Sequence, residues 1–92
     1  MSEARRTCTI VNQRGLHARA SAKFVNAVAA LPDGCNVRVA KDGNEAGGGS
    51  ILGLMMLGAA KGDSVEVTVK GDAAEERLAE LVEMVEGGFG ED

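Results

Sequence analysis

The stretch RTCTIVNQRGLHARASAKFVNAVAAL, residues 6–31, changes its hydrophobic pattern partway along and so indicates a strand followed by a helix. Residues 6–11 are rich in β-branched side chains and alternate in polarity, which is typical of a strand, and the polar residues 12–15 end it. From Ala18 onward the pattern becomes helical until LPDG at 31–34. The predicted buried face of this helix contains Ser21, Phe24, Val25, Val28 and Leu31.

Residues 36–57 predict a hairpin and then a short helix. Val37 and Val39 alternate with polar residues, and an Asp-Gly pair at 42–43 supplies a tight turn before a weak following strand. Ser50 is placed to cap a helix that runs to about Leu57, and the glycines at 47–49 give its approach freedom of turn.

The last segments, a strand and a helix, complete the order βαββαβα. SVEVTVK at 64–70 alternates valine with polar residues. Asp72 is expected to cap the final helix, with Glu75 three residues on. Strands that alternate apolar and polar residues leave one face of a sheet exposed to solvent. We therefore expect an antiparallel or mixed sheet covered by helices on its other face, an α+β two-layer domain. The expected apolar stripe of the final helix is Ala74, Leu78, Leu81, Val82 and Val85.

Length and composition narrow the classes of function. The 92 residues fit one small domain, expected to span 1–92, in which a deep enclosed active site is not expected. A formal charge of −4 and two aromatic residues, Phe24 and Phe89, argue against a nucleic-acid partner. The sequence has no leader-like segment and no apolar run long enough for a bilayer, so we expect a cytoplasmic protein without membrane insertion. Cys8 and Cys35 are interpreted as reduced and structural, and one histidine with two distant cysteines predicts no metal site.

His17, the single histidine, stands at the predicted start of the first helix, after a glycine that permits a sharp turn. The free amides of Ala18, Arg19 and Ala20 would point past the imidazole together with the positive end of the helix dipole. That field disfavours imidazolium and favours an arriving anion, phosphate above all. Carboxylates are absent between Ala4 and Pro32, and we expect the basic residues of this segment to lie around the histidine; they are Arg5, Arg6, Arg14, Arg19 and Lys23.

Two classes of function fit these residues. A neutral imidazole beside arginine and helix amides has what phosphoryl transfer requires, a nucleophile with charge stabilisation. The other class is a small regulatory or ligand-binding βαββαβ module without covalent chemistry, since a lone histidine is often a surface or core residue. The sequence shows neither a hydrolytic triad nor a nucleotide-binding P-loop.

Two segments resemble the signatures of one known family. GLHARASAKFV at 15–25 is similar to the active-site signature of the HPr phosphocarrier family of the bacterial phosphotransferase system, and GGGSILGLMMLGAAKGD at 47–63 is similar to its second signature, around a regulatory serine. The match covers residues 6–85. The resemblance implies an open-faced sandwich, an antiparallel four-stranded sheet covered on one face by three helices.

The resemblance also implies roles for individual residues. His17 would accept a phosphoryl group from phospho-Enzyme I, ultimately from phosphoenolpyruvate, and pass it to an acceptor such as an enzyme II type A domain. Arg19 would contact the phosphoryl group, and Ser50 would be the target of a serine kinase and phosphatase. The chain would be a carrier rather than a turnover enzyme, with no cofactor. Ala20 stands where the family usually has proline, which leaves open the sugar-uptake and the nitrogen-related branches.

The short helix after Ser50 has more apolar residues than one buried stripe can use. Leu54, Leu57 and Gly53 are expected to face the sheet. An exposed apolar cluster usually marks a binding surface, and methionine suits several partners, although a covering loop is the alternative. The side chains expected outside are Ile51, Leu52, Met55 and Met56, of which the first three fall where the resemblance implies partner docking.

Overall fold

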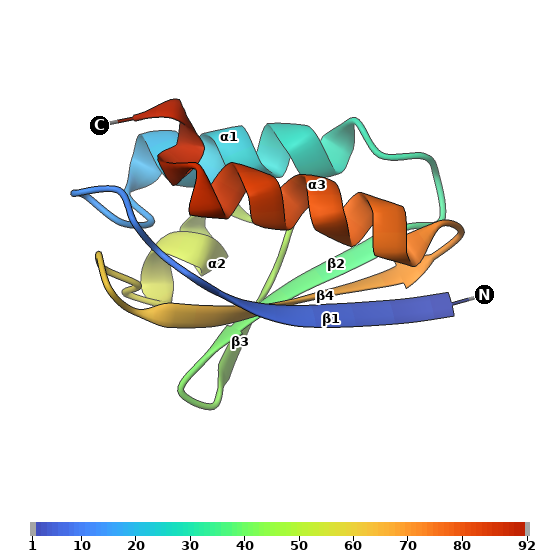
Figure 1. The fold of residues 1–92 in the computed structure, drawn as a ribbon, viewed down its shortest axis with the longest axis horizontal. Helices are drawn as coiled ribbons and strands as arrows, with labels where there is room; N and C mark the ends of the chain where they lie inside the picture. Colours follow the sequence, from blue (N-terminus) through green and yellow to red (C-terminus); the bar gives the residue numbers. More distant parts are fainter. Residues whose placement is uncertain (1, 92) are drawn as a thin grey trace.

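A computed structural model of the chain describes residues 2–91. Within them the elements follow the predicted order βαββαβα, with one added turn of 3₁₀ helix at the end (Figure 1). The elements are β1 (Ser2–Thr9), α1 (Ala18–Ala29), β2 (Asn36–Lys41), β3 (Asn44–Gly47), α2 (Ile51–Met56), β4 (Ser64–Gly71), α3 (Ala74–Glu86) and η1 (Gly88–Gly90).

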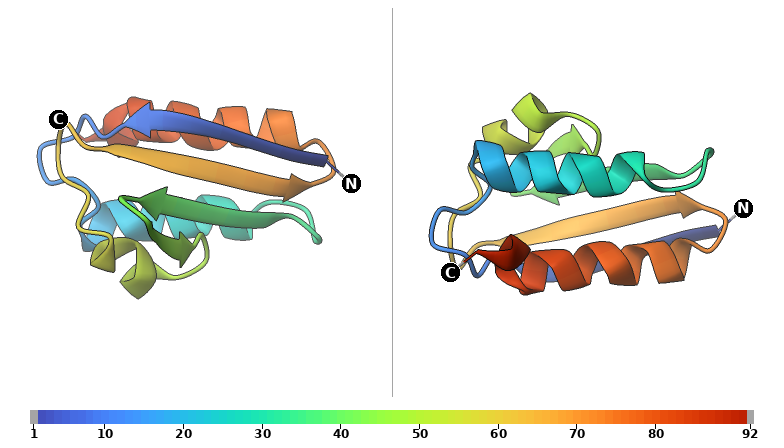
Figure 2. Two further views of the ribbon diagram at one scale, coloured as in Figure 1. Left: turned by 90° about the horizontal axis from the view of Figure 1, so that it is seen from below. Right: turned by 90° about the horizontal axis from the view of Figure 1, so that it is seen from above.

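The four strands of the described residues form one antiparallel sheet in the order β1-β4-β2-β3. Helices α1 and α3 lie side by side over one face of this sheet, and α2 lies beside the N-terminal end of α1 (Figures 1 and 2). In β4 the residues Val65, Val67 and Val69 are buried, whereas Glu66 and Thr68 stay partly exposed. This alternation confirms the expected two layers, with one open face of the sheet.

The core between the layers is almost entirely aliphatic. All five residues of the stripe predicted for α3 are buried, as are Ser21 and Phe24 of α1. Val25, Val28 and Leu31 pack against the core but stay partly exposed. Cys8 is buried in β1, and burial, with a further contribution from the charge of Glu86, raises the pKa of its thiol to about 11.

One predicted boundary and one predicted cap are wrong. The first strand spans Ser2–Thr9 rather than 6–11, because residues 2–5 also pair with β4, in a register that runs from Ser2 opposite Gly71 to Thr9 opposite Ser64. Asp72 does not cap α3: the cap position belongs to Ala73, whose backbone is left-handed at φ 57° and whose side chain makes no capping hydrogen bond. The tight turn from Gly71 to the helix places Asp72 one residue before the cap position, so its side chain does not cap the helix.

The hairpin of β2 and β3 forms as predicted. Asp42 and Gly43 both have positive φ, 50° and 84°, as a two-residue turn between twisted strands requires.

The loop from β1 to α1 depends on a close approach of two backbone segments. Gly15 has φ 60°, and a Cβ built on it would lie 2.2 Å from the carbonyl oxygen of Ala59, in the loop between α2 and β4. The next amide, that of Leu16, donates to the same carbonyl at 2.9 Å. Only glycine fits this position without moving one of the two loops.

We predict that Gly15→Ala lowers the free energy of unfolding by about 2–4 kcal/mol, because the backbone strain adds to a clash with an atom that cannot move freely. Gly43→Ala is the matched control, since Gly43 also has a positive φ, 84°, but a Cβ there would meet nothing within 4 Å. The Gly43→Ala substitution should lower the free energy of unfolding by only about 1 kcal/mol. Chemical denaturation measures both, and equal losses would show that the Ala59 contact does not constrain the loop.

Candidate functional site

The contact between Gly15 and Ala59 fixes where α1 begins, and His17 occupies its N-cap position. Leu16 is buried beneath the loop, and its carbonyl accepts a hydrogen bond from the buried hydroxyl of Ser21 at 3.2 Å. The amide of Ser21 donates to the carbonyl of His17 at 2.9 Å, as the N-cap position requires. The imidazole is therefore attached to backbone that is held from both sides.

The Nδ1 edge of the ring faces the N-terminus of α1. The amide of Arg19 donates to Nδ1 at 3.3 Å. The first backbone hydrogen bond within α1 runs from the amide of Ser21 to the carbonyl of His17. The amides before it, those of Ala18, Arg19 and Ala20, therefore have no acceptor within the helix backbone. The expected juxtaposition of imidazole and helix amides is thus present.

A carboxylate that the sequence did not predict faces the other edge of the ring. Both carboxylate oxygens of Glu91 lie 3.0 Å from Nε2 of His17. The two side chains are 15% and 17% exposed, so the contact is largely shielded from water. The hydrogen bond from His17 is the main reason why the pKa of Glu91 falls below its usual value; a hydrogen bond from Asn12 and the charge of Lys23 add to this, and partial burial opposes it.

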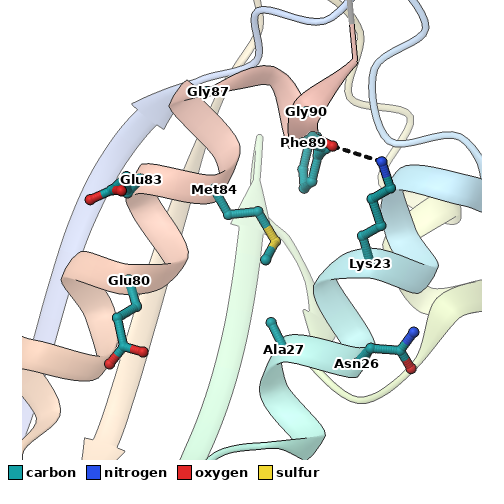
Figure 3. A pocket seen from close by; sticks show the side chains of 9 residues that line it. All are labelled: Lys23, Asn26, Ala27, Glu80, Glu83, Met84, Gly87, Phe89 and Gly90. Carbon is teal, nitrogen blue, oxygen red and sulfur yellow. Dashed lines mark hydrogen bonds between the residues drawn. The ribbon is translucent and has the colours of Figure 1, made fainter.

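The chain after α3 carries Glu91 to the ring. Phe89 is buried with a left-handed backbone at φ 58°, between Gly88 and Gly90, which are also left-handed. Its carbonyl accepts a hydrogen bond from Nζ of Lys23 at 2.8 Å, which ties the tail to α1 across the groove between α1 and α3 (Figure 3). An aromatic residue between two glycines after the last helix was the available signal for a packed tail, but it does not reveal what the tail approaches.

Asn12 joins the loop to the tail. Its side-chain amide donates to the carbonyl of Gly15 at 2.9 Å and to Oε1 of Glu91 at 3.2 Å. The side chain is only 1% exposed, so these bonds are sheltered from competition with water.

An open pocket of about 440 Å³ surrounds the ring. Three of the five basic residues expected near His17 line it, namely Arg14, Arg19 and Lys23. The expectation is wrong for the other two: Arg5 pairs with Glu3 at 3.4 Å, and Arg6 lies in a different hollow beside α3. They belong to β1, which lies under α3 rather than near the start of α1. The remaining lining residues are Gln13, His17, Gly90 and Glu91.

Helix α2 presents the expected apolar surface. Ser50 caps it, since the amide of Gly53 donates to the Ser50 hydroxyl at 2.9 Å. Leu54 and Leu57 are buried and Gly53 is half-buried. The predicted exposure of the other four side chains is confirmed, at 41% for Ile51, 67% for Leu52, 40% for Met55 and 77% for Met56.

Helix α2 lies close to the loop that carries the histidine. Helix α2 packs beside the N-terminal end of α1 (Figure 2), and the loop that follows α2 contains Ala59, the partner of Gly15. Neither α2 nor any other helix in residues 2–91 combines the length and the apolarity needed to cross a membrane.

Comparisons with known proteins show which family the chain resembles. The family model described as "PTS HPr component phosphorylation site" matches residues 4–87. The phosphocarrier protein HPr of Pseudomonas aeruginosa is 42% identical over 84 residues, which cover 90% of this chain and 91% of that protein. The phosphocarrier protein NPr of Escherichia coli is 35% identical over 91 residues, which cover 96% of this chain and 97% of that protein.

Solved structures show the same fold. A crystal structure of HPr-C-His from Thermoanaerobacter tengcongensis superposes with a TM-score of 0.86 at 37% identity, and covers 100% of this chain and 99% of that one. A phosphocarrier protein HPr from Bacillus anthracis gives a TM-score of 0.84 at 28% identity, over 92% of this chain and 99% of that one. The chain therefore belongs to the HPr family of phosphocarriers of the phosphotransferase system.

Proposed function

We propose that the chain accepts a phosphoryl group on Nδ1 of His17 from phospho-Enzyme I and passes it to a downstream acceptor such as an enzyme II type A domain. The observation that carries this proposal is the orientation of the ring, whose Nδ1 edge faces the amide of Arg19 at the N-terminus of α1. A group transferred to Nδ1 would meet the free amides and positive dipole end of the helix, an arrangement that favours phosphate.

The basic residues of the pocket support the same chemistry. Phosphoryl transfer passes through a loose transition state with charge spread over the phosphoryl oxygens, so catalysis consists mainly of positioning and charge stabilisation. Arg19 is exposed on α1 and lines the pocket with His17, where its planar guanidinium would match two phosphoryl oxygens.

The relay reaction should label His17 alone. Incubation with Enzyme I and phosphoenolpyruvate should increase the intact mass by about 80 Da, the mass of one phosphoryl group. His17→Ala should abolish the gain, and the label should be lost in acid, as phosphorus bound to nitrogen is. A regulatory module without covalent chemistry predicts no gain in mass, and an acid-stable label would place the phosphoryl group on a hydroxyl instead.

Arg19→Ala should leave the melting temperature nearly unchanged, because the side chain is exposed, but should slow phosphoryl transfer to His17. Arg19→Lys should restore only part of the rate, since an ammonium lacks the planar fork. Arg5→Ala is the matched control, as Arg5 is also exposed but pairs with Glu3 on β1. An Arg19→Ala protein as fast as the Arg5→Ala protein would remove Arg19 from the site.

The exposed surface of α2 is proposed as the docking site for Enzyme I and the acceptor, with Ile51, Leu52 and Met55 at its centre. These side chains are 40–67% exposed, and partner binding would bury the exposed part of each, at a gain of up to about 1.5–3 kcal/mol for a fully exposed side chain. Phosphorylation of Ser50, an exposed hydroxyl next to Ile51, would add about two negative charges to this apolar surface and hinder docking.

Leu52→Gln should weaken the binding of Enzyme I by about 10- to 100-fold, with little change in stability, because Leu52 is 67% exposed. Leu54→Gln is the contrast on the opposite face of the same helix: Leu54 is 1% exposed, so its substitution should destabilise the fold. Titration calorimetry and thermal unfolding measure the two effects. Full Enzyme I affinity in folded Leu52→Gln would place the docking surface elsewhere.

A further inference from the structure

We propose that Glu91 is a positioning residue for phosphoryl transfer to His17: its carboxylate holds the ring proton on Nε2, which leaves the Nδ1 lone pair directed at the N-terminus of α1. The same carboxylate offsets the positive charge that the ring acquires on phosphorylation. This inference rests on the proposed function and adds a residue to the same site.

The geometry determines which ring nitrogen carries the proton. An ionised carboxylate can only accept hydrogen bonds, and both Glu91 oxygens lie 3.0 Å from Nε2, so Nε2 is the donor. A neutral imidazole has one ring proton, so Nδ1 must be an acceptor, which agrees with the 3.3 Å contact from the Arg19 amide. The lowered pKa of Glu91 keeps the carboxylate ionised at neutral pH.

The structure holds the carboxylate from several directions. Asn12 donates to Oε1 of Glu91 at 3.2 Å while its own position is fixed by the carbonyl of Gly15. Burial of the Phe89 ring, together with the 2.8 Å bond from Lys23 to the Phe89 carbonyl, fixes the chain two residues before Glu91. Phe89 keeps a left-handed backbone that is unfavourable for an aromatic residue, so the packing of the tail must offset this strain.

The transfer step needs no movement of a proton. The Nδ1 lone pair forms a bond to phosphorus, the bond between phosphorus and the donor breaks, and its electron pair leaves with the donor. Nε2 keeps its proton throughout, so the neutral ring becomes a phosphorylated imidazolium with one positive charge. The Glu91 carboxylate, already within 3.0 Å of Nε2, stabilises that charge as it develops.

Repulsion between Glu91 and the phosphoryl group is the opposing effect. The two lie on opposite edges of the ring, so their separation exceeds the 3.0 Å that joins the carboxylate to Nε2. Coulombic energy falls with distance, and Arg14 and Arg19 line the pocket around the ring, where their charges would offset that of the phosphoryl group. The attraction at Nε2 therefore outweighs the repulsion.

The test compares Glu91→Ala and Glu91→Gln with Glu83→Ala, which removes an exposed carboxylate from α3 as a matched control. Single-turnover transfer from phospho-Enzyme I at saturating concentration should be about tenfold slower in Glu91→Ala, the effect of losing one charge-assisted hydrogen bond. Glu91→Gln should give an intermediate rate, since an amide oxygen accepts a hydrogen bond without the charge. Glu83→Ala should match the parent protein.

A second readout follows the ring itself. In mildly alkaline solution, where free imidazole is neutral, the proton on Nε2 should give a protected NMR signal in the parent protein and in Glu83→Ala, but not in Glu91→Ala. Transfer by Glu91→Ala at the parent rate would overturn the inference while leaving the proposed function intact. Faster transfer would also overturn the inference, because Glu91 would then hinder the access of the donor to the ring. Failure of the parent protein to accept a phosphoryl group would overturn both proposals.

Discussion

The backbone of Gly15 lies against the carbonyl of Ala59, and the position of the imidazole depends on this contact. A Cβ on Gly15 would come within 2.2 Å of the Ala59 oxygen, and the Leu16 amide donates to that oxygen at 2.9 Å. The loop turns at Gly15, and His17 follows two residues later at the N-cap of α1. The same contact joins the histidine loop to the loop that follows α2, so the pocket and the exposed apolar surface of α2 are held at one end of the molecule.

The site combines opposite charges on opposite edges of a single ring. Nδ1 faces the amides of α1 and Nε2 faces the carboxylate of Glu91, while Arg14, Arg19 and Lys23 line the pocket around the ring. Each charge serves the proposed carrier in a different way, since the positive edge receives the phosphoryl group and the negative edge stabilises the ring that carries it. A phosphoryl group held in so open a pocket is accessible to a second protein, as a relay requires.

The elements with regular hydrophobic periodicity were predictable from the sequence, because burial on one face enforces that pattern. The stripe of α3, the valines of β4 and the excess apolar residues of α2 are examples. Boundaries set by tertiary contacts were not: β1 is extended by its pairing with β4, and the left-handed Ala73 displaces Asp72 from the cap of α3. His17 and its helix amides follow from local sequence. Glu91 does not, because 74 residues separate it from the ring it contacts and only the packed tail joins them.

In the proposed function, the fold directs phosphorylation to one nitrogen of one ring. Long-range NMR correlation of ¹⁵N-labelled, phosphorylated protein identifies the nitrogen that is bonded to phosphorus. We expect phosphorus on Nδ1 of His17 and a proton on Nε2, within reach of Glu91. Phosphorus on Nε2, the nitrogen that the carboxylate covers in this structure, would show that the fold does not direct the phosphoryl group to the helix N-terminus.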